Sequence, residues 1–183
     1  MRDELTREQE KILLKLARRT IENHLGIGGT LKPGPQDPVM KEKRGAFVTL
    51  KIDGELRGCI GYPLPYKPLD ETVSEMAVAA ASQDYRFAPL TVEEVGRVRI
   101  EISVLSLPRR VQDVGEVEVG RHGIIVSKGA HRGLLLPQVP LEYGWDRETF
   151  LSHGSLKAGL PADAWKKGAL IEVFEARVFS EEG

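Results

Sequence analysis

Apolar and polar positions alternate along this chain with two periods, and each period indicates one type of secondary structure. Near the start, apolar residues recur at the spacing of one face of an amphipathic helix: Leu13, Leu14, Ala17, Ile21 and Leu25. The run Thr6-Arg7-Glu8-Gln9 before them is a capping box, and Gly26 after them suits a helix end. We therefore expect an N-terminal helix that covers a sheet or another helix.

Residues 45–61 indicate two short strands joined by Asp53-Gly54. Asp-Gly between alternating apolar residues is a strong hairpin signal, because a type I′ turn requires positive φ at both central positions. With Ile52 opposite Glu55, strict alternation sets three further pairs: Leu50 with Arg57, Val48 with Cys59, and Ala46 with Gly61. This register predicts that Arg57 and Cys59 share one face of the sheet.

The rest of the chain continues this mixture of helices and strands. A second helix is indicated by apolar residues at helical spacing: Leu69, Val73, Met76, Ala77, Ala80 and Ala81. Alternation predicts a strand at 98–104, and apolar runs indicate a second hairpin within 122–136. Residues 170–179, rich in Ile, Val and Phe, indicate a last strand, and Asp146 is a suitable N-cap for a third helix. The pattern predicts an α+β fold with a largely antiparallel sheet flanked by helices, in which the first hairpin and strand 98–104 share a sheet.

One long segment, residues 26–43, has no periodicity and is rich in Gly, Pro, Lys and Asp. Such a composition is typical of a surface loop. The loop is long for a compact domain, so it is either a plain linker or a flap over a site.

Composition narrows the class of protein. The 183 residues are enough for one well-packed domain, and 41% apolar with 29% charged residues is ordinary for a globular protein. No apolar run approaches the roughly 20 residues that span a bilayer, and the charged N-terminus does not resemble a signal peptide, so we expect a cytoplasmic protein without a membrane segment. A net charge of −1 gives no general attraction to nucleic acid, so we do not expect nucleic-acid binding. Asn23 is the only asparagine among abundant Lys, Arg and Glu, a bias seen in thermophile proteins.

Cys59 is the only cysteine, which excludes an internal disulfide and a multi-thiolate metal site. Three interpretations remain for it. It packs as a small buried hydrophobe beside Val48, which predicts slow alkylation. It acts as a nucleophile activated by Arg57 and a nearby histidine. Or it binds a metal together with one of His122, His131 and His153, which is the weakest of the three, so we predict no metal.

Arg57 is predicted on an apolar strand face, where its charge requires a partner. The partner is either an acid, Asp84 or Asp146, or an anionic ligand. Gly58 and Gly61 indicate either close approach of a backbone or ligand, or a bulge.

The motifs themselves resemble a known family. Leu56-Arg57-Gly58-Cys59-Ile60-Gly61 is similar to the signature of the AMMECR family, named from the Alport syndrome, midface hypoplasia and elliptocytosis chromosomal region. Further blocks match in order: Asp84-x-Arg86-Phe87-x-Pro89-Leu90, His122-Gly123-Ile124, Gly133 to Val139, Gly144-Trp145-Asp146 and Lys157-Ala158-Gly159-Leu160. Many members carry a cysteine just before the last block, where this chain has Ser155.

The resemblance implies a single domain over residues 1–183 with a larger and a smaller lobe, whose shared blocks line a cleft between them. Prokaryotic members are called AmmeMemoRadiSam system protein A, which implies Memo-like and radical SAM proteins as partners. The family has no established activity, so neither an enzyme class nor a cofactor follows from it.

Two functional hypotheses remain. In the first, the chain is an enzyme or enzyme component that acts on a small anionic ligand. Arg57 and Arg86 hold the acid group, Gln138 orients it, and Cys59 or His122 carries the chemistry. The other residues expected to line this site are Gly58, Gly61, Trp145 and Asp146. In the second hypothesis, the chain is a noncatalytic ligand-binding or adaptor subunit.

Overall fold

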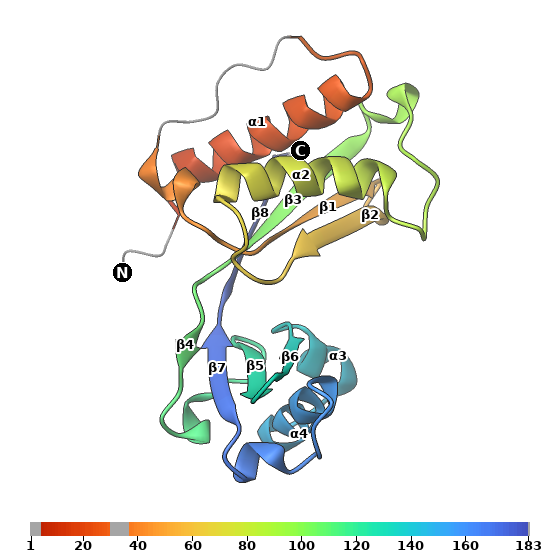
Figure 1. Ribbon diagram of the computed structural model, residues 1–183. Helices are drawn as coiled ribbons and strands as arrows, with labels where there is room; N and C mark the ends of the chain where they lie inside the picture. Colours follow the sequence, from red (N-terminus) through yellow and green to blue (C-terminus); the bar gives the residue numbers. More distant parts are fainter. Residues whose placement is uncertain (1–4, 30–36, 183) are drawn as a thin grey trace. The chain divides into compact units, whose positions relative to one another are not determined.

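The chain divides into two compact units (Figure 1). Unit 1 comprises residues 1–105 and 177–183, and unit 2 comprises residues 106–176. The structure, a computed structural model, describes residues 5–29 and 37–182. Residues 30–36 lie outside these ranges, and they form the middle of segment 26–43, which the sequence indicated as a linker or a flap. Near the end of that segment, Pro38–Lys41 form a 3₁₀ turn.

Unit 1 contains a four-stranded sheet in the order β2-β1-β3-β8. Its strands are β1 (Ala46–Ile52), β2 (Glu55–Tyr62), β3 (Val98–Leu105) and β8 (Ala176–Ser180). The helices α1 (Arg7–His24) and α2 (Leu69–Ser82) pack on one face of this sheet (Figure 1). The first hairpin and strand 98–104 therefore share an antiparallel sheet, as predicted.

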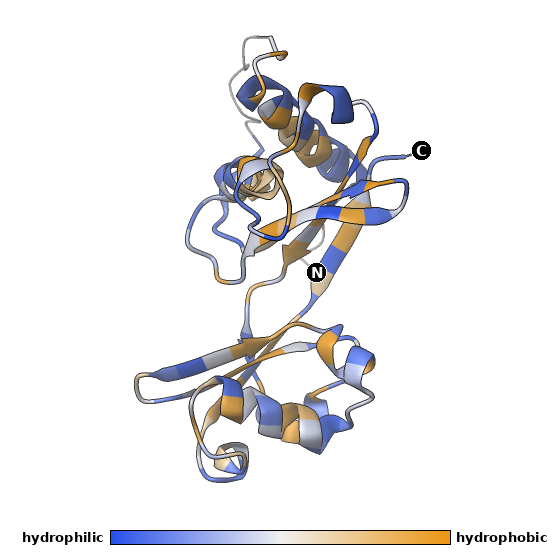
Figure 2. Ribbon diagram, turned by 90° about the vertical axis from the view of Figure 1, so that its right-hand side faces the viewer, coloured by the Kyte–Doolittle hydropathy of each residue, from blue (hydrophilic) through white to orange (hydrophobic). Residues whose placement is uncertain are grey.

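The apolar stripe of α1 forms the core of unit 1 together with the inward positions of the sheet. Leu13, Ala17 and Ile21 are fully buried in the same cluster as Val48 and Ile102. Hydrophilic and hydrophobic residues alternate around the helices and along the strands (Figure 2). The predicted capping box is present, because the Thr6 hydroxyl accepts the Gln9 N–H at 3.2 Å and the Gln9 side chain accepts the Thr6 N–H at 2.8 Å.

The turn of the first hairpin is as predicted, but the register beyond it is not. Asp53 and Gly54 both have positive φ, 53° and 85°, as a type I′ turn requires. The register then shifts between Leu50 and Lys51, so that Leu50 lies opposite Gly58. Arg57 is the extra residue of a β-bulge, and all three predicted pairs beyond the turn are wrong: Leu50 with Arg57, Val48 with Cys59 and Ala46 with Gly61.

Unit 2 contains a second four-stranded sheet, in the order β4-β7-β5-β6. Its elements are β4 (Arg109–Arg110), β5 (Gly123–Lys128), β6 (His131–Leu135), β7 (Leu170–Phe174), α3 (Val139–Tyr143) and α4 (Arg147–Lys157). Short 3₁₀ turns lie at Val92–Glu94 in unit 1 and at Val114–Glu116 and Ala164–Lys166 in unit 2. The second core is formed by α4 against the sheet, with Phe150 and Leu151 fully buried beside Ile124 and Val126.

The last predicted strand, residues 170–179, is two strands of two different sheets. β7 belongs to unit 2 and β8 to the sheet of unit 1, and only Glu175 separates them. The backbone of Glu175 is held by Ser106, whose N–H donates to the Glu175 carbonyl and whose hydroxyl accepts the Glu175 N–H, both at 2.9 Å. Apolar residues continue on both sides of Glu175, so the composition of this run indicates a single strand and does not mark the change of sheet.

Within the described ranges, no helix is long and apolar enough to cross a membrane.

Candidate functional site

Cys59 lies on the face of the unit 1 sheet that α1 and α2 do not cover. The bulge at Arg57 pairs Cys59 with Thr49, whose neighbours Val48 and Leu50 point into the helix-covered core. The thiol is half-buried, and the Thr49 hydroxyl donates a hydrogen bond to Sγ at 3.2 Å. The expectation of a buried thiol beside Val48 is wrong, because the inserted residue moves Cys59 to the opposite face.

The backbone of Cys59 is held at the outer edge of β2 by the segment after α2. The Cys59 N–H donates to Oδ2 of Asp84 at 2.9 Å, and its carbonyl accepts from Nη2 of Arg86 at 3.4 Å. These backbone groups therefore point away from β1, which makes Thr49 and Cys59 a non-hydrogen-bonded pair. In such a pair the two side chains lie closest together, which accounts for the contact between hydroxyl and thiol.

Asp84 and Arg86 form a two-pronged ion pair at this edge. The Arg86 Nε donates to Oδ1 at 2.9 Å and Nη2 to Oδ2 at 2.7 Å. The Asp84 side chain is buried, whereas that of Arg86 is 45% exposed. The hydrogen bonds from Arg86 hold the pKa of Asp84 well below its usual range against the opposing effect of burial. The Arg86 Nη1 has no hydrogen bond within the part of the chain that the structure describes.

Arg57 is paired with an acid, but with neither of those expected. Its Nε and Nη2 donate to the two carboxylate oxygens of Glu94, both at 2.9 Å. Nη1 donates to the carbonyl of Ala88 at 2.9 Å, and Nη2 also reaches that of Pro89 at 3.4 Å. The bidentate pair lowers the pKa of Glu94. Arg57 thus fastens the loop after α2 to β2, and its role toward a ligand stays a prediction.

Gly58 and Gly61 each face a protein group at close range. A Cβ on Gly58 would lie 2.2 Å from the backbone oxygen of Ala80 in α2. A Cβ on Gly61 would lie 2.3 Å from the ring of Phe47. For Gly58, two of the predicted reasons are present: a backbone group approaches closely, and a bulge lies next to it. The close contacts explain both glycines without a ligand.

The uncovered face of the sheet carries further polar side chains near Cys59. Thr49 lies opposite Cys59 on one side and Glu101 of β3 on the other, so the three form a row across the strands. Lys51 pairs with Glu101 at 3.0 Å and its side chain is 38% exposed. A thiol, a hydroxyl, a carboxylate and an ammonium group therefore share this face.

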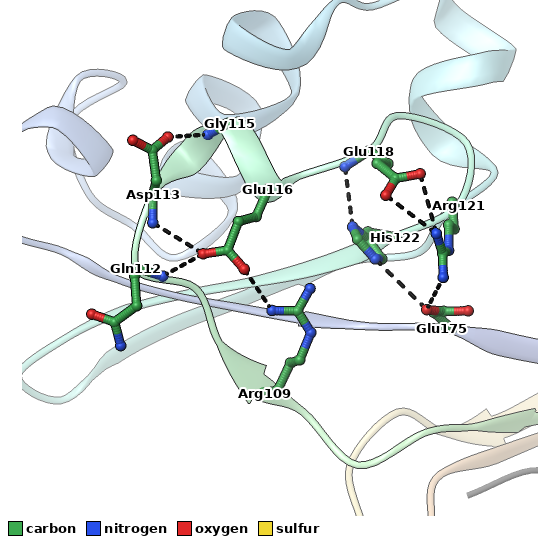
Figure 3. A network of polar contacts seen from close by, with 9 residues as sticks. All are labelled: Arg109, Gln112, Asp113, Gly115, Glu116, Glu118, Arg121, His122 and Glu175. Atoms are coloured by element: carbon green, nitrogen blue, oxygen red, sulfur yellow. Dashed lines mark hydrogen bonds and ion pairs between the residues drawn. The ribbon is translucent and has the colours of Figure 1, made fainter. Parts of the chain in front are cut away.

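His122 is buried in unit 2, with 2% of its surface exposed. Its Nδ1 accepts the N–H of Glu118 at 3.1 Å, and its Nε2 lies 3.7 Å from a carboxylate oxygen of Glu175 (Figure 3). Arg121 pairs with both Glu118 and Glu175 in the same network. These contacts fix the turn before β5. They give His122 a structural role, and its predicted catalytic role gains no support from them.

Trp145 lies in the middle of a stack of three rings in unit 2. Its ring is 4.9 Å from that of Tyr143 and 3.8 Å from that of His153, with interplanar angles of 17° and 7°. Asp146 is the N-cap of α4, as predicted, and its hydrogen bonds to Thr149 lower its pKa. Gln138 is exposed and precedes α3, and the structure gives its side chain no capping hydrogen bond.

The predicted site residues thus fall into two groups. Arg57, Gly58, Cys59, Gly61 and Arg86 belong to unit 1 and lie at or beside the outer strand β2. The remaining four, in unit 2, are His122, Gln138, Trp145 and Asp146. A cleft between the two lobes stays a prediction.

Sequence reasoning missed three contributors, Glu94, Thr49 and Tyr143, and it considered His153 only as a metal ligand. Glu94 lies 37 residues from Arg57, and its capping box with Thr91 marks it only as a local helix start. Thr49 requires knowledge of the bulge, and Tyr143 and His153 join Trp145 without a recognisable spacing. Ser155 is fully buried and its hydroxyl donates to the carbonyl of Leu151, so it packs within α4.

Metal binding has no apparent site in residues 5–29 and 37–182. No group of three or more His, Cys, Asp or Glu side chains in these ranges is placed to hold a metal ion.

Comparisons with known proteins cover nearly the whole chain. A model of the AMMECR1 family matches residues 14–179. Protein MK0488 of Methanopyrus kandleri is 49% identical over 192 residues, which cover 100% of this chain and 93% of that protein. Protein MJ0810 of Methanocaldococcus jannaschii is 45% identical over 186 residues, covering 97% and 92%. The crystal structure of uncharacterized protein PH0010 from Pyrococcus horikoshii matches with a TM-score of 0.76 at 42% identity, covering 97% of this chain and 94% of that chain.

Proposed function

This chain belongs to the AMMECR1 family, and on that premise we propose that unit 1 binds a small anionic ligand beside the Cys59 thiol, as an enzyme or enzyme component. One observation carries the proposal: a half-exposed thiol lies next to a guanidinium with one nitrogen left over. Arg86 uses Nε and Nη2 to hold Asp84 and the Cys59 carbonyl. Its Nη1 is available to an anion at the same edge of the sheet.

Two polar side chains contact Cys59, one at its sulfur and one at its backbone. The Thr49 hydroxyl donates to Sγ, and the Arg86 guanidinium donates to the carbonyl of the same cysteine. Arg86 is close enough for Cys59 to contribute, after Asp84, to the raised pKa of the guanidinium. The ligand class that fits is a small carboxylate that also carries a carbonyl group. When the thiol adds to this carbonyl, the S–C bond forms, the π electrons pass to oxygen, and the thiol proton ends on that oxygen.

In this proposal Arg57 positions the site and does not bind the ligand. Its guanidinium is committed to Glu94 and to two carbonyls, so it holds the loop that carries Asp84 and Arg86 against β2. The proposal places the protein in the cytoplasm, where a single half-buried thiol stays reduced.

The experiment compares two alkylating reagents of opposite character. Iodoacetate is anionic and iodoacetamide is neutral, and intact-mass measurements follow the modification of Cys59 by each. We expect the rate ratio of iodoacetate to iodoacetamide to exceed that of free cysteine several-fold, because Arg86 concentrates the anion beside the sulfur. Addition of a 2-oxo carboxylate such as pyruvate should slow both reactions.

Two double variants make the test specific. Asp84→Asn with Arg86→Gln removes both charges of the clamp, so that no buried carboxylate is left unpaired, and should return the ratio to that of free cysteine. Asp53→Asn with Arg97→Gln removes an exposed ion pair at the hairpin tip and should leave the ratio unchanged. A wild-type ratio equal to that of free cysteine contradicts the proposal, as does an equal effect of both double variants.

A second candidate function, a noncatalytic adaptor, is favoured by exposed apolar side chains in unit 2. Leu141, Tyr143 and Leu156 are 62%, 68% and 52% exposed. The same part of the chain contains Gln138, Trp145 and Asp146. The partners proposed for this adaptor are Memo-like and radical SAM proteins, and with them the chain would have the role of AmmeMemoRadiSam system protein A. Complementation of a strain that lacks the gene separates the two functions. Loss with Cys59→Ala and retention with Tyr143→Ser favours the thiol site, and the reverse favours the adaptor.

A further inference from the structure

A groove of about 500 Å³ runs along α1 in unit 1, beside the end of the chain. Its size falls within the roughly 300–1,000 Å³ of typical ligand sites. Leu14 of α1 and Phe179 of β8 are apolar residues of its lining, and both are buried. Arg18 closes one part of it, because its guanidinium donates to Glu181 and to the carbonyls of Val95 and Val98. The groove is therefore held in place by hydrogen bonds within unit 1, with α1 as one wall and the end of β8 as the other.

The helix wall of this groove carries a row of cations. Arg7, Lys11, Lys15 and Arg19 occupy every fourth position of α1, and all four side chains are exposed. None of the four makes an ion pair with a residue in the described ranges, whereas two acids of the groove are already neutralised. Glu10 pairs with Arg177 at 2.7 Å, and Glu181 pairs with Arg18. Glu22 and Glu182 are the remaining acids of the lining, so the row of cations is in excess.

The opposite wall is formed by Phe179 and Ser180, the last residues of the edge strand β8, and by the two glutamates that follow them. β8 is the last strand in the order β2-β1-β3-β8, so one side of its backbone has no strand partner among residues 5–29 and 37–182. The other edge of the same sheet is treated differently. There the loop after α2 covers β2 through Asp84, Arg86 and the carbonyls that Arg57 holds. Side chains therefore cover the β2 edge of this sheet, whereas a cationic groove lies beside the end of the β8 edge.

We propose that this groove binds an extended acidic segment of a partner protein, which adds to β8 as a further strand. The edge of β8 supplies backbone hydrogen bonds, and the cations of α1 receive the acidic side chains of the segment. This interaction surface is separate from the Cys59 site and does not depend on the function proposed for it.

A protein segment fits the groove better than a nucleic acid does. Proteins that bind single strands combine cations with exposed aromatic rings on which bases stack. Phe179 is the aromatic residue of this lining, and it is 9% exposed, so it offers no stacking surface. The net charge of the whole chain, −1, also gives no general attraction to phosphate backbones.

The test is a titration of the full-length, ¹⁵N-labelled protein followed by the chemical shifts of its backbone amides. The probe is a synthetic peptide of alternating glutamate and valine, which is acidic and favours extended structure. We expect saturable shifts confined to the outer face of α1 and to residues 178–182. The same peptide with lysine in place of glutamate should cause no shifts, and an oligothymidylate of similar length should bind more weakly than the acidic peptide.

Charge-reversal variants locate the contact. Lys11→Glu with Lys15→Glu should weaken binding of the acidic peptide by about tenfold or more, equivalent to about 1.4 kcal/mol. Lys43→Glu with Arg110→Glu changes the net charge equally at exposed positions outside the groove and should alter binding by less than about twofold. Both pairs are on the surface, so melting temperatures should stay close to that of the wild type.

Three results would overturn the proposal. The first is the absence of shifts at residues 178–182, and the second is an equal loss of binding in both double variants, which would indicate nonspecific attraction. The third is tighter binding of the oligothymidylate than of the peptide. Strand addition itself is tested with a peptide N-methylated at alternate residues, which cannot form the backbone hydrogen bonds. Its binding should be lost, and unchanged binding contradicts an added strand.

Discussion

At the scale of single residues, one inserted residue decides the chemistry of the site. The bulge at Arg57 takes this arginine out of the strand ladder and turns Cys59 to the uncovered face of the sheet. Arg57 then reaches Glu94, and Cys59 meets the Thr49 hydroxyl. A period of two residues assigns faces correctly only while the ladder is regular, so a bulge inverts every assignment beyond it.

The buried carboxylate of Asp84 predicts a specific dependence of stability on pH. Its pKa is lowered in the folded state, chiefly by Arg86, so it stabilises the fold above its unfolded pKa of about 3.9. This contribution is lost as the pH falls from there toward the folded pKa. Asp84→Asn should lower the free energy of unfolding by about 1–3 kcal/mol at pH 7. Below about pH 4 the difference from wild type should shrink by up to about 1.4 kcal/mol per pH unit.

Urea unfolding at neutral and acid pH measures this difference. Asp53→Asn, which removes a carboxylate that is 72% exposed, is the control and should cost less than about 0.5 kcal/mol at pH 7. A difference for Asp84→Asn that is constant from pH 7 to about pH 2.5 contradicts the stabilising role of the ionised Asp84.

At the scale of elements, local signals in the sequence predict where helices and turns begin but not how strands are paired. The capping box at Thr6, the Asp53-Gly54 turn and the N-cap Asp146 were all predicted, because each depends on neighbours within a few residues. The bulge and the division of residues 170–179 were not predicted, since both follow from distant contacts. The same holds for the candidate site. The sequence motif identified Cys59, but the contacts of Asp84 and Arg86 with the Cys59 backbone could be seen only in the structure.

The packing of α2 on β2 gives a prediction for Gly58. A Cβ there would lie 2.2 Å from the Ala80 backbone oxygen, so Gly58→Ala must push the helix away from the strand. We expect a loss of about 1–3 kcal/mol in the free energy of unfolding. Gly96→Ala is the matched control, because a Cβ at Gly96 has no heavy atom within 4 Å, and its effect should be near zero. If Gly58→Ala keeps the stability of the wild type but loses ligand binding, the glycine serves the ligand and not the helix.

At the scale of the whole molecule, unit 2 is an insertion into unit 1. Residues 106–176 are continuous, whereas unit 1 needs the chain end to add β8 to its sheet. Each unit has a hydrophobic core of its own, one beneath α1 and α2 and the other beneath α4. The apolar pattern predicted strands and helices for both units, but it did not predict the boundaries at residues 105 and 177, because these follow from contacts between strands that are distant in the sequence.

Two separate cores predict two separable unfolding transitions. Both tryptophans, Trp145 and Trp165, lie in unit 2, so tryptophan fluorescence follows that unit, whereas far-UV circular dichroism is dominated by the longer helices of unit 1. Leu50→Ala opens a cavity in the first core and should cost about 2–5 kcal/mol there. It should lower the midpoint seen by circular dichroism and leave the fluorescence midpoint nearly unchanged. Leu151→Ala in the second core should do the reverse, and equal shifts by both probes in either variant would mean that the two units unfold as one.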